Sequence, residues 1–191
     1  LDRPYVLFVG TIEPRKNVNG IVDAFRKIKA EYPHRLVIAG AKGWLDKDYD
    51  LDLDPDDWSE RLHIAATGNV FETRGSEFPK GRLIETGYVS QFDLPALYSA
   101  ADALIFPSFY EGFGLPVLEA MACGCPVITA NNSSLPEVAG DAAEYCDAND
   151  VDSIANAMRR VLSDESLREQ MRQRGFAQAA KFSWKKTAEQ T

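Results

Sequence analysis

Two glutamates, Glu111 and Glu119, stand with seven residues between them in a glycine-containing segment that reads EGFGLPVLE. Gly112 and Gly114 allow a tight turn and a close approach of the backbone to a ligand. The proline that follows suits the first turn of a helix, whose free amides point outward from its amino end. The segment therefore predicts a cradle for an anion or for hydroxyl groups, with Glu111 just before it.

Glu119 falls about one turn inside that predicted helix, among apolar residues. A carboxylate in such a position must be paired or must bind polar groups of a ligand, such as sugar hydroxyls. A salt bridge to an arginine or lysine at the edge of the core is the structural alternative. We therefore treat Glu119 as a candidate binding residue.

Arg15 and Lys16 form a second candidate group, between Gly10 and a predicted helix. The amino end of a helix already favours an anion, and two cations added there would make a diphosphate site. Solvated charges in the first turn are the alternative interpretation. Because cations are mildly unfavourable at that end of a helix, the pattern favours a function.

Short apolar runs alternate with longer helical patterns, which predicts right-handed βαβ units. The expected strands cover residues 5–9, 36–39, 83–89, 103–106, 126–130 and, more weakly, 142–146, and the expected helices cover residues 18–32, 94–101, 116–123, 151–162 and 166–180. The predicted fold class is α/β, a Rossmann-like open parallel sheet with helices on both faces. Ligands bind beyond the carboxyl ends of the strands in such sheets, and the loops there hold Arg15, Lys16 and Glu111.

The composition fits one well-cored domain of 191 residues, with 45% hydrophobic and 26% charged residues. A net charge of −8 argues against a nucleic-acid partner. No apolar run approaches the ~20 residues that span a bilayer. The chain begins at Leu1 rather than at methionine, so we expect it to be a piece of something longer. Three cysteines do not make a disulfide framework and predict reduced thiols in a cytosolic protein.

Residues 43–82 break the pattern and predict an acidic surface insertion with a short helix around residues 57–65. Residues 46–57 include seven aspartates and one lysine. A pair of alternate aspartates could hold a divalent cation beside a nucleotide diphosphate, but a solvated acidic loop is the preferred interpretation. His34 and His63 are isolated, so we expect neither a catalytic triad nor a histidine-rich metal site.

Two common nucleotide fingerprints are absent. The first strand–helix loop has no G-x-G-x-x-G, and the chain has no G-x-x-x-x-G-K-[ST]. A dinucleotide oxidoreductase is therefore disfavoured, although it stays an alternative of another class.

The segment EGFGLPVLE resembles the E-x7-E motif of retaining GT-B glycosyltransferases of family 4, and the surrounding sequence is similar too. The other matching stretches are TGYVS at 86–90, LPALY at 94–98, ADALIFP at 101–107, ACGCPVI at 122–128, LPEVAGD at 135–141 and FSWKKTA at 182–188. The resemblance covers nearly all of the chain except about residues 43–82.

The resemblance implies a role for each candidate residue. Glu119 would bind the ribose hydroxyls, and Lys16 would neutralise the leaving diphosphate. Arg15 would take the role of an arginine that many members carry where this chain has Thr11. Glu111 would hold the donor sugar and diphosphate, together with the backbone at Gly112, Phe113, Gly114 and Leu115. Gly10 would also contact the substrate. The backbone around Val89 would contact the base.

The same resemblance implies an enzyme of two Rossmann-like domains, of which this chain, 1–191, is the C-terminal one. It would bind a nucleotide-diphosphate sugar, GDP-mannose by preference, without metal or cofactor. The N-terminal domain would carry the acceptor site, so this domain alone would transfer little or nothing. The acceptor would be a glycan or lipid-linked, in bacterial surface polysaccharide synthesis. We expect a cytoplasmic location, or the inner face of a membrane through the other domain.

Two further alternatives stay open at this point. A nucleotide-sugar-binding module of the same fold could have lost transfer, because a fold does not fix a function. A metal-dependent GT-A transferase could use the aspartate tract, and a loss of binding on addition of EDTA would favour it.

Overall fold

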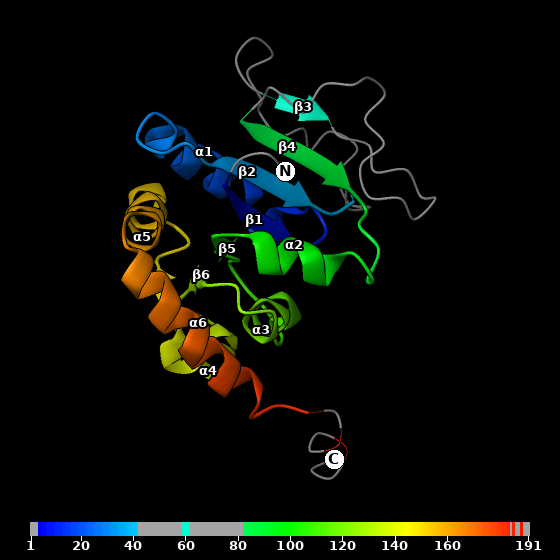
Figure 1. The fold of residues 1–191 in the computed structure, drawn as a ribbon. Helices are drawn as coiled ribbons and strands as arrows, with labels where there is room; N and C mark the ends of the chain where they lie inside the picture. Colours follow the sequence, from blue (N-terminus) through cyan, green and yellow to red (C-terminus); the bar gives the residue numbers. More distant parts are fainter. Residues whose placement is uncertain (1–3, 42–58, 62–81, 184, 186–187, 189–191) are drawn as a thin grey trace.

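The computed structural model describes residues 4–41, 59–61 and 82–183, together with residues 185 and 188. These parts form a seven-stranded sheet in which every paired strand is parallel, with helices on both faces (Figure 1). The predicted α/β, Rossmann-like fold is confirmed. The aspartate tract at 46–57 and the rest of the expected insertion, apart from residues 59–61 and 82, lie outside the described residues.

The sheet has the strand order β3-β4-β2-β1-β5-β6-β7. The strands are β1 (Tyr5–Val9), β2 (Arg35–Ala39), β3 (Ser59–Arg61), β4 (Leu83–Gly87), β5 (Ala103–Phe106), β6 (Val127–Ala130) and β7 (Ala143–Cys146). β1 lies between β2 and β5 and is buried along its whole length. A strand buried on both faces favours a continuous apolar run, which explains its sequence YVLFV.

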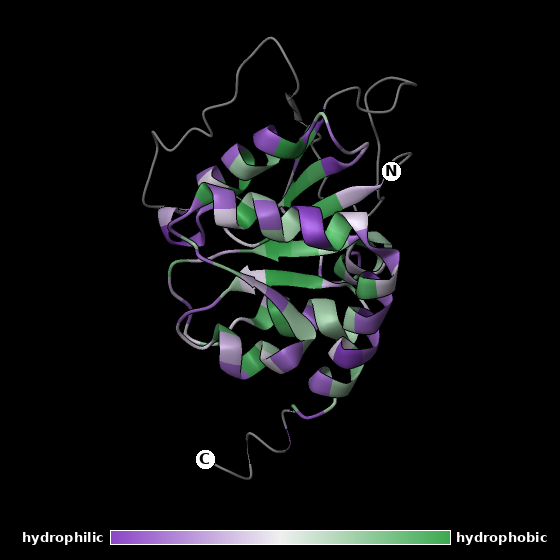
Figure 2. Ribbon diagram, turned by 90° about the vertical axis from the view of Figure 1, so that its left-hand side faces the viewer, coloured by the Kyte–Doolittle hydropathy of each residue, from purple (hydrophilic) through white to green (hydrophobic). Residues whose placement is uncertain are grey.

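The helices follow the strands in alternation. They are η1 (Pro14–Lys16), α1 (Val18–Ile28), α2 (Leu94–Ala100), α3 (Leu115–Ala122), α4 (Leu135–Ala139), η2 (Gly140–Ala142), α5 (Val151–Ser163) and α6 (Glu165–Ala179), where η marks a 3-10 helix. α1 buries an apolar stripe that recurs at helical spacing, and its other face is polar (Figure 2). Asp150 and Asp164 begin α5 and α6, because each side chain accepts a hydrogen bond from a first-turn amide.

The chain changes direction across the sheet next to β1. From β1 it passes through α1 to β2 on one side, and from β5 it passes through α3 to β6 on the other. Right-handed crossovers in opposite directions place α1 and α3 on opposite faces of the sheet. The loops that leave the carboxyl ends of β1 and β5 therefore meet at a switch point, where open α/β sheets bind ligands.

Several short elements differ from the sequence expectations. Residues 59–61 form strand β3, paired with β4, so the short helix expected around residues 57–65 is wrong. α1 ends at Ile28 rather than near residue 32, and α4 and the two 3-10 helices were not predicted. β3, α4 and the two 3-10 helices have three to five residues each, too few for a hydrophobic period to show in the sequence. Cys123, Cys125 and Cys146 are free thiols, as expected.

Candidate functional site

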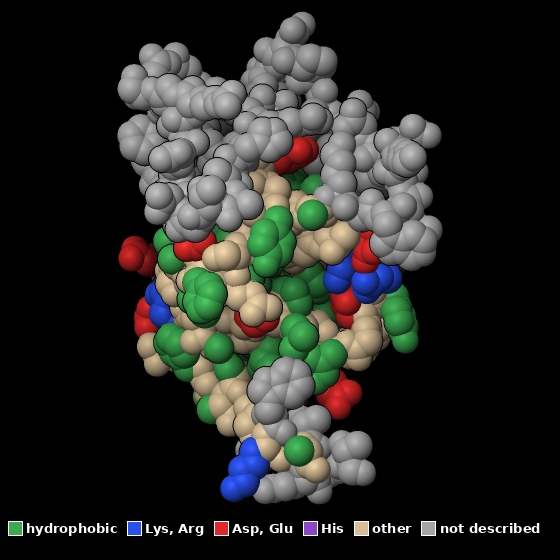
Figure 3. Space-filling model, turned by 90° about the vertical axis from the view of Figure 1, so that its right-hand side faces the viewer, with side chains coloured by type: hydrophobic (Ala, Val, Ile, Leu, Met, Phe, Trp, Pro, Cys, Tyr) green, Lys and Arg blue, Asp and Glu red, His purple; other side chains and the backbone are tan. Residues whose placement is uncertain are grey.

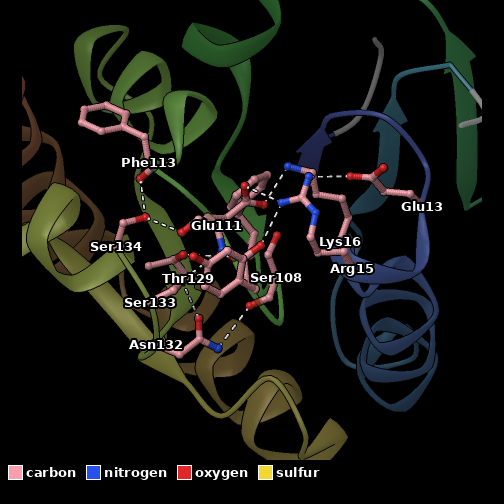
Figure 4. Close-up of polar contacts among 12 residues, drawn as sticks. Glu13, Arg15, Lys16, Ser108, Glu111, Phe113, Thr129, Asn132, Ser133 and Ser134 are labelled. Carbon is pink, nitrogen blue, oxygen red and sulfur yellow. Dashed lines mark hydrogen bonds and ion pairs between the residues drawn. The ribbon is translucent and has the colours of Figure 1, made fainter.

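The loops after β1 and β5 lie against each other at the carboxyl edge of the sheet. The Phe109 amide donates to the Arg15 carbonyl at 2.9 Å, which joins the two loops through their main chains. Arg15 and Lys16 belong to η1, which immediately precedes α1, rather than to the first turn of α1 itself. The structure thus brings the two predicted cations to Glu111 (Figure 4).

Both carboxylate oxygens of Glu111 accept a hydrogen bond from a cation. The Lys16 ammonium donates to Oε1 at 2.7 Å, and Arg15 Nη1 donates to Oε2 at 2.8 Å. Arg15 also donates to the Tyr110 carbonyl at 2.8 Å and, through Nη2, to the Glu13 carboxylate at 2.6 Å. These four side chains, Glu13, Arg15, Lys16 and Glu111, make one ion-pair network with no net charge.

The network is buried on one side and open on the other. Lys16 is 8% exposed and Glu111 7%, whereas the Arg15 side chain is 43% exposed. The Lys16 ammonium also lies 4.9 Å from the centre of the Phe106 ring, a cation–π contact. A buried pair of this kind is held in one geometry, whereas Arg15 can exchange a partner with a ligand.

Two opposing effects act on the pKa of Glu111. Burial alone raises this pKa, but the hydrogen bonds from Lys16 and Arg15 and the nearby Ser108 hydroxyl outweigh burial and lower it. The Ser108 hydroxyl is buried and has no well-formed hydrogen bond of its own. For Arg15, burial opposes the charge, but its bonds to Glu111 and Glu13 raise its pKa. The Glu111 carboxylate and the Arg15 guanidinium are therefore held in their charged forms at neutral pH.

The main chain of Glu111 is held by the loop after β6. The Glu111 amide donates to Ser133 Oγ at 3.1 Å, and the Ser134 hydroxyl donates to the Glu111 carbonyl at 2.9 Å. The Asn132 amide donates to the Ser108 carbonyl at 3.2 Å. Ser133 has a φ of 47°, an unusual conformation for a residue other than glycine. Sequence reasoning missed these residues because their contacts are to a loop some twenty residues away.

The predicted cradle forms the amino end of α3. Gly114 caps the helix with a φ of 101°, and a Cβ atom there would lie 2.9 Å from Leu135 Cδ2, so glycine is required. Gly112, by contrast, has no positive φ and has open space where a Cβ would stand, so the fold itself does not require glycine there. Phe113 and Leu115 are exposed, and the amides of residues 113–115 lie at the end of α3 where helix amides lack internal acceptors.

Glu119 belongs to a different environment from Glu111. It lies on α3, is exposed, and accepts a hydrogen bond of 3.0 Å from the Tyr98 hydroxyl on α2. Its partner is therefore a neutral hydroxyl rather than the arginine or lysine of the structural alternative. Tyr98 is fully buried, and both burial and the adjacent Glu119 carboxylate raise its pKa.

The two remaining predicted contacts also lie at the carboxyl edge of the sheet. Gly10 follows β1, and its amide donates to the Ala39 carbonyl at 3.0 Å. Val89 follows β4 and is buried, with 6% of its surface exposed. Figure 3 faces this edge, where apolar side chains gather among acidic and basic ones. The exposed large apolar residues that follow β4 and β5 are Tyr88, Phe92, Phe109, Tyr110, Phe113 and Leu115.

The arrangement suits an anion next to polar hydroxyl groups. It combines two cations, the amino end of a helix and an exposed carboxylate on that same helix. Within the described ranges, no cluster of three or more His, Cys, Asp or Glu side chains could hold a metal ion. Among the same residues, none of the helices has the length and apolar character needed to cross a bilayer.

Comparisons with known proteins identify the family and relatives of the chain. Residues 1–64 and 74–178 match the family described as Glycosyl transferases group 1. The chain is 42% identical over 191 residues to the O-antigen chain mannosyltransferase B of Escherichia coli, covering 98% of this chain and 44% of that protein. The chain thus spans less than half the length of this relative.

Two solved structures share the fold. The sucrose-phosphate synthase of Thermosynechococcus elongatus has a TM-score of 0.74 and 26% identity, over 99% of this chain and 44% of that one. An Anabaena protein in complex with UDP-glucose has a TM-score of 0.73 and 20% identity, over 94% of this chain and 44% of that one. With the family match over most of its residues, the chain belongs to the glycosyl transferases group 1 family.

Proposed function

We propose that this chain is the C-terminal, donor-binding domain of a retaining glycosyltransferase. The whole enzyme would transfer a hexosyl group from a nucleotide-diphosphate sugar, GDP-mannose by preference, to a glycan or lipid-linked acceptor in surface polysaccharide synthesis. The acceptor site would lie in an N-terminal domain of the same protein, and the enzyme would work in the cytoplasm or at the inner face of a membrane. This domain alone would transfer little or nothing.

The observation that carries the proposal is the joining of Arg15 and Lys16 to Glu111 at the switch point, beside the amino end of α3. During transfer, negative charge builds on the departing diphosphate. Fixed cations and helix amides stabilise that charge without reorganising, which lowers the barrier. Because Arg15 is the exposed member of the network, it is the group that can exchange the Glu13 carboxylate for a phosphate.

Glu119 supports the nucleotide part of the proposal. Among the described residues its exposed carboxylate accepts one hydrogen bond, from the Tyr98 hydroxyl, which leaves acceptor capacity for the two hydroxyls of a ribose. The backbone near Val89 would then contact the base, and Glu111 with the backbone of residues 112–115 would face the sugar and diphosphate.

The relatives support the donor and the two-domain organisation. The mannosyltransferase similarity favours a mannosyl donor, and the Anabaena protein of the same fold holds UDP-glucose. The chain covers only 44% of each, which leaves room for a second domain. The presence of Arg15, Lys16, Glu111 and Glu119 together favours a transferase over a module that only binds nucleotide sugars.

A thermal-shift titration of this chain with GDP, UDP, ADP and NAD, with and without EDTA, tests the proposal. A ligand at 100 times its dissociation constant stabilises a fold by about 2.7 kcal/mol, which such a titration resolves. We expect a shift with one nucleoside diphosphate and no change on adding EDTA, and the responding nucleotide then identifies the base.

The other outcomes contradict the proposal in distinct ways. A shift that EDTA abolishes would favour a metal-dependent transferase, and a shift with NAD alone would favour an oxidoreductase. Stability unchanged by all four nucleotides would show that this chain does not bind donors by itself.

A further inference from the structure

Asn17 stands between η1 and α1 in a conformation that few residues other than glycine adopt. Its φ is 56° and its ψ is 38°, and the residue is only 7% exposed. Its backbone amide donates to the Pro14 carbonyl at 3.0 Å, and its backbone carbonyl accepts from the Ile21 amide at 3.1 Å. Asn17 therefore ends the turn that carries Arg15 and Lys16 and begins α1.

The Asn17 side chain connects three loops at the carboxyl edge of the sheet. Its Nδ2 donates to the Ala148 carbonyl, after β7, at 2.7 Å and to the Pro107 carbonyl, after β5, at 3.2 Å. Both hydrogens of the amide are used. The opposite orientation would set the side-chain oxygen against two carbonyl oxygens, so the amide has one workable orientation.

The first turn of α1 makes room for this side chain. A Cβ atom on Gly20 would lie 2.4 Å from Asn17 Oδ1, so only glycine at position 20 leaves the amide where it is. Glycine inside a helix lowers its stability by about 1 kcal/mol relative to alanine. The chain thus carries an unfavourable helix residue at the one place that admits the Asn17 amide.

We propose that Asn17 is a positioning residue that sets where Arg15 and Lys16 stand relative to Glu111 and the amino end of α3. The proposal rests on the donor-binding function proposed above. Arg15 and Lys16 directly precede Asn17, and the Arg15 carbonyl is bonded to Phe109 in the loop that carries Glu111. The Pro107 bond from Asn17 fixes the same loop from its other end. Without the Asn17 side-chain amide, Arg15 and Lys16 are free to shift away from the diphosphate.

A positioning role and a merely structural role differ in which part of the ligand is affected. A loss of positioning weakens recognition of the diphosphate and spares the nucleoside, because the proposed nucleoside contacts lie in the loop after β4 and on α3. A general loosening of the fold weakens both equally. The ratio of the two affinities therefore reports on Asn17 independently of stability.

The test is Asn17→Gly in the 191-residue chain. Glycine accepts the positive φ at no steric cost and removes only the side-chain bonds. The probes are GDP, UDP and ADP, and the one that binds the parent chain most tightly is compared with its nucleoside by nuclear magnetic resonance titration. We expect the diphosphate affinity to fall about tenfold, the equivalent of one or two hydrogen bonds, while the nucleoside affinity changes less than about twofold.

A second variant and a control accompany it. Gly20→Ala retains Asn17 but displaces its amide, and it improves the helix, so it should lower diphosphate affinity selectively without unfolding the chain. Tyr5→Phe removes a buried hydrogen bond of 2.7 Å to the Leu97 carbonyl, and Tyr5 lies at the amino end of β1, away from the site. This control should leave both affinities unchanged.

The outcomes separate this inference from the proposed function. If the parent chain binds none of the three diphosphates, the proposed function fails and this inference with it. If the parent binds one and the folded variants keep its ratio of diphosphate to nucleoside affinity, only the role of Asn17 is overturned.

Discussion

Glu111 and Glu119 are the same residue type on the same stretch of chain, yet their surroundings are opposite. Glu111 is 7% exposed and bonded to two cations, and its main chain is held by Ser133 and Ser134. Glu119 is exposed and accepts one hydrogen bond from the hydroxyl of Tyr98. The Glu111 carboxylate holds the surrounding loops together, whereas the Glu119 carboxylate faces solvent and can accept further hydrogen bonds.

The difference suggests that Glu111 contributes mainly to the stability of the fold and Glu119 mainly to ligand binding. A buried carboxylate that neutralises a buried lysine contributes to stability, because removing it leaves an unpaired charge in the interior. An exposed carboxylate contributes little to folding and is free to bind a ligand. We therefore expect substitutions at Glu111 to affect the fold first and substitutions at Glu119 to affect nucleotide binding.

The largest effect is expected from Glu111→Gln. Its free energy of unfolding should fall by about 2–4 kcal/mol, because Lys16 loses its charged partner while staying buried. Urea denaturation measures the loss, and Glu119→Gln, which should cost less than about 0.5 kcal/mol, is the matched control. Equal losses in the two variants would show that Glu111 contributes no more to stability than Glu119 does.

Next in size is the effect of Glu119→Ala on nucleotide affinity. The loss of bonds to the ribose should weaken binding by about 1–3 kcal/mol with little change in the melting temperature. Isothermal titration with the nucleotide that stabilises the parent chain measures this. Glu169→Ala, which removes another exposed glutamate on α6, is the control and should bind like the parent. A folded Glu119→Ala chain with unchanged affinity would refute the ribose assignment.

Tyr98→Phe tests whether the hydroxyl of Tyr98 positions the Glu119 carboxylate for binding. The Tyr98 hydroxyl holds one carboxylate oxygen in place, so its removal should cost about 0.5–1.5 kcal/mol of nucleotide affinity. The same titration measures it. If the variant binds as tightly as the parent, the Glu119 carboxylate does not need Tyr98 to be placed.

The smallest effect is a pH dependence carried by Glu111. Its pKa is lowered below the ordinary value of 4.5, since bonds from Lys16 and Arg15 outweigh burial. A group with a lowered pKa stabilises the fold above its ordinary pKa, and that contribution is lost as pH falls through the folded-state value.

The difference in unfolding free energy between the parent and Glu111→Gln should therefore shrink as pH falls below 4.5. Asp102, whose pKa is lowered by its bond from His34, is common to both proteins and cancels. Urea denaturation of both chains across this range measures the trend. A constant difference would show that Glu111 is not held by charge.

Much of the fold could be read from the sequence because its main elements carry periodic signals. β1 and β5 are continuous apolar runs, and α1 repeats apolar residues at helical spacing, so each was expected within a few residues of where it lies. β3 and α4 are too short for a period. The parts of the site that were expected, Arg15, Lys16 and Glu111, stood in loops at the ends of predicted strands.

The sequence by itself determined the alternation of strands and helices, and hence the parallel sheet and the edge where a ligand can bind. It also determined the candidate side chains and their resemblance to a transferase family. Only the tertiary structure decided that Lys16 and Arg15 share Glu111, that Glu119 pairs with Tyr98, and that Asn17 connects three loops. These contacts join residues 21 to 131 positions apart. They depend on which strands are neighbours in the sheet, and no local pattern in the chain encodes that.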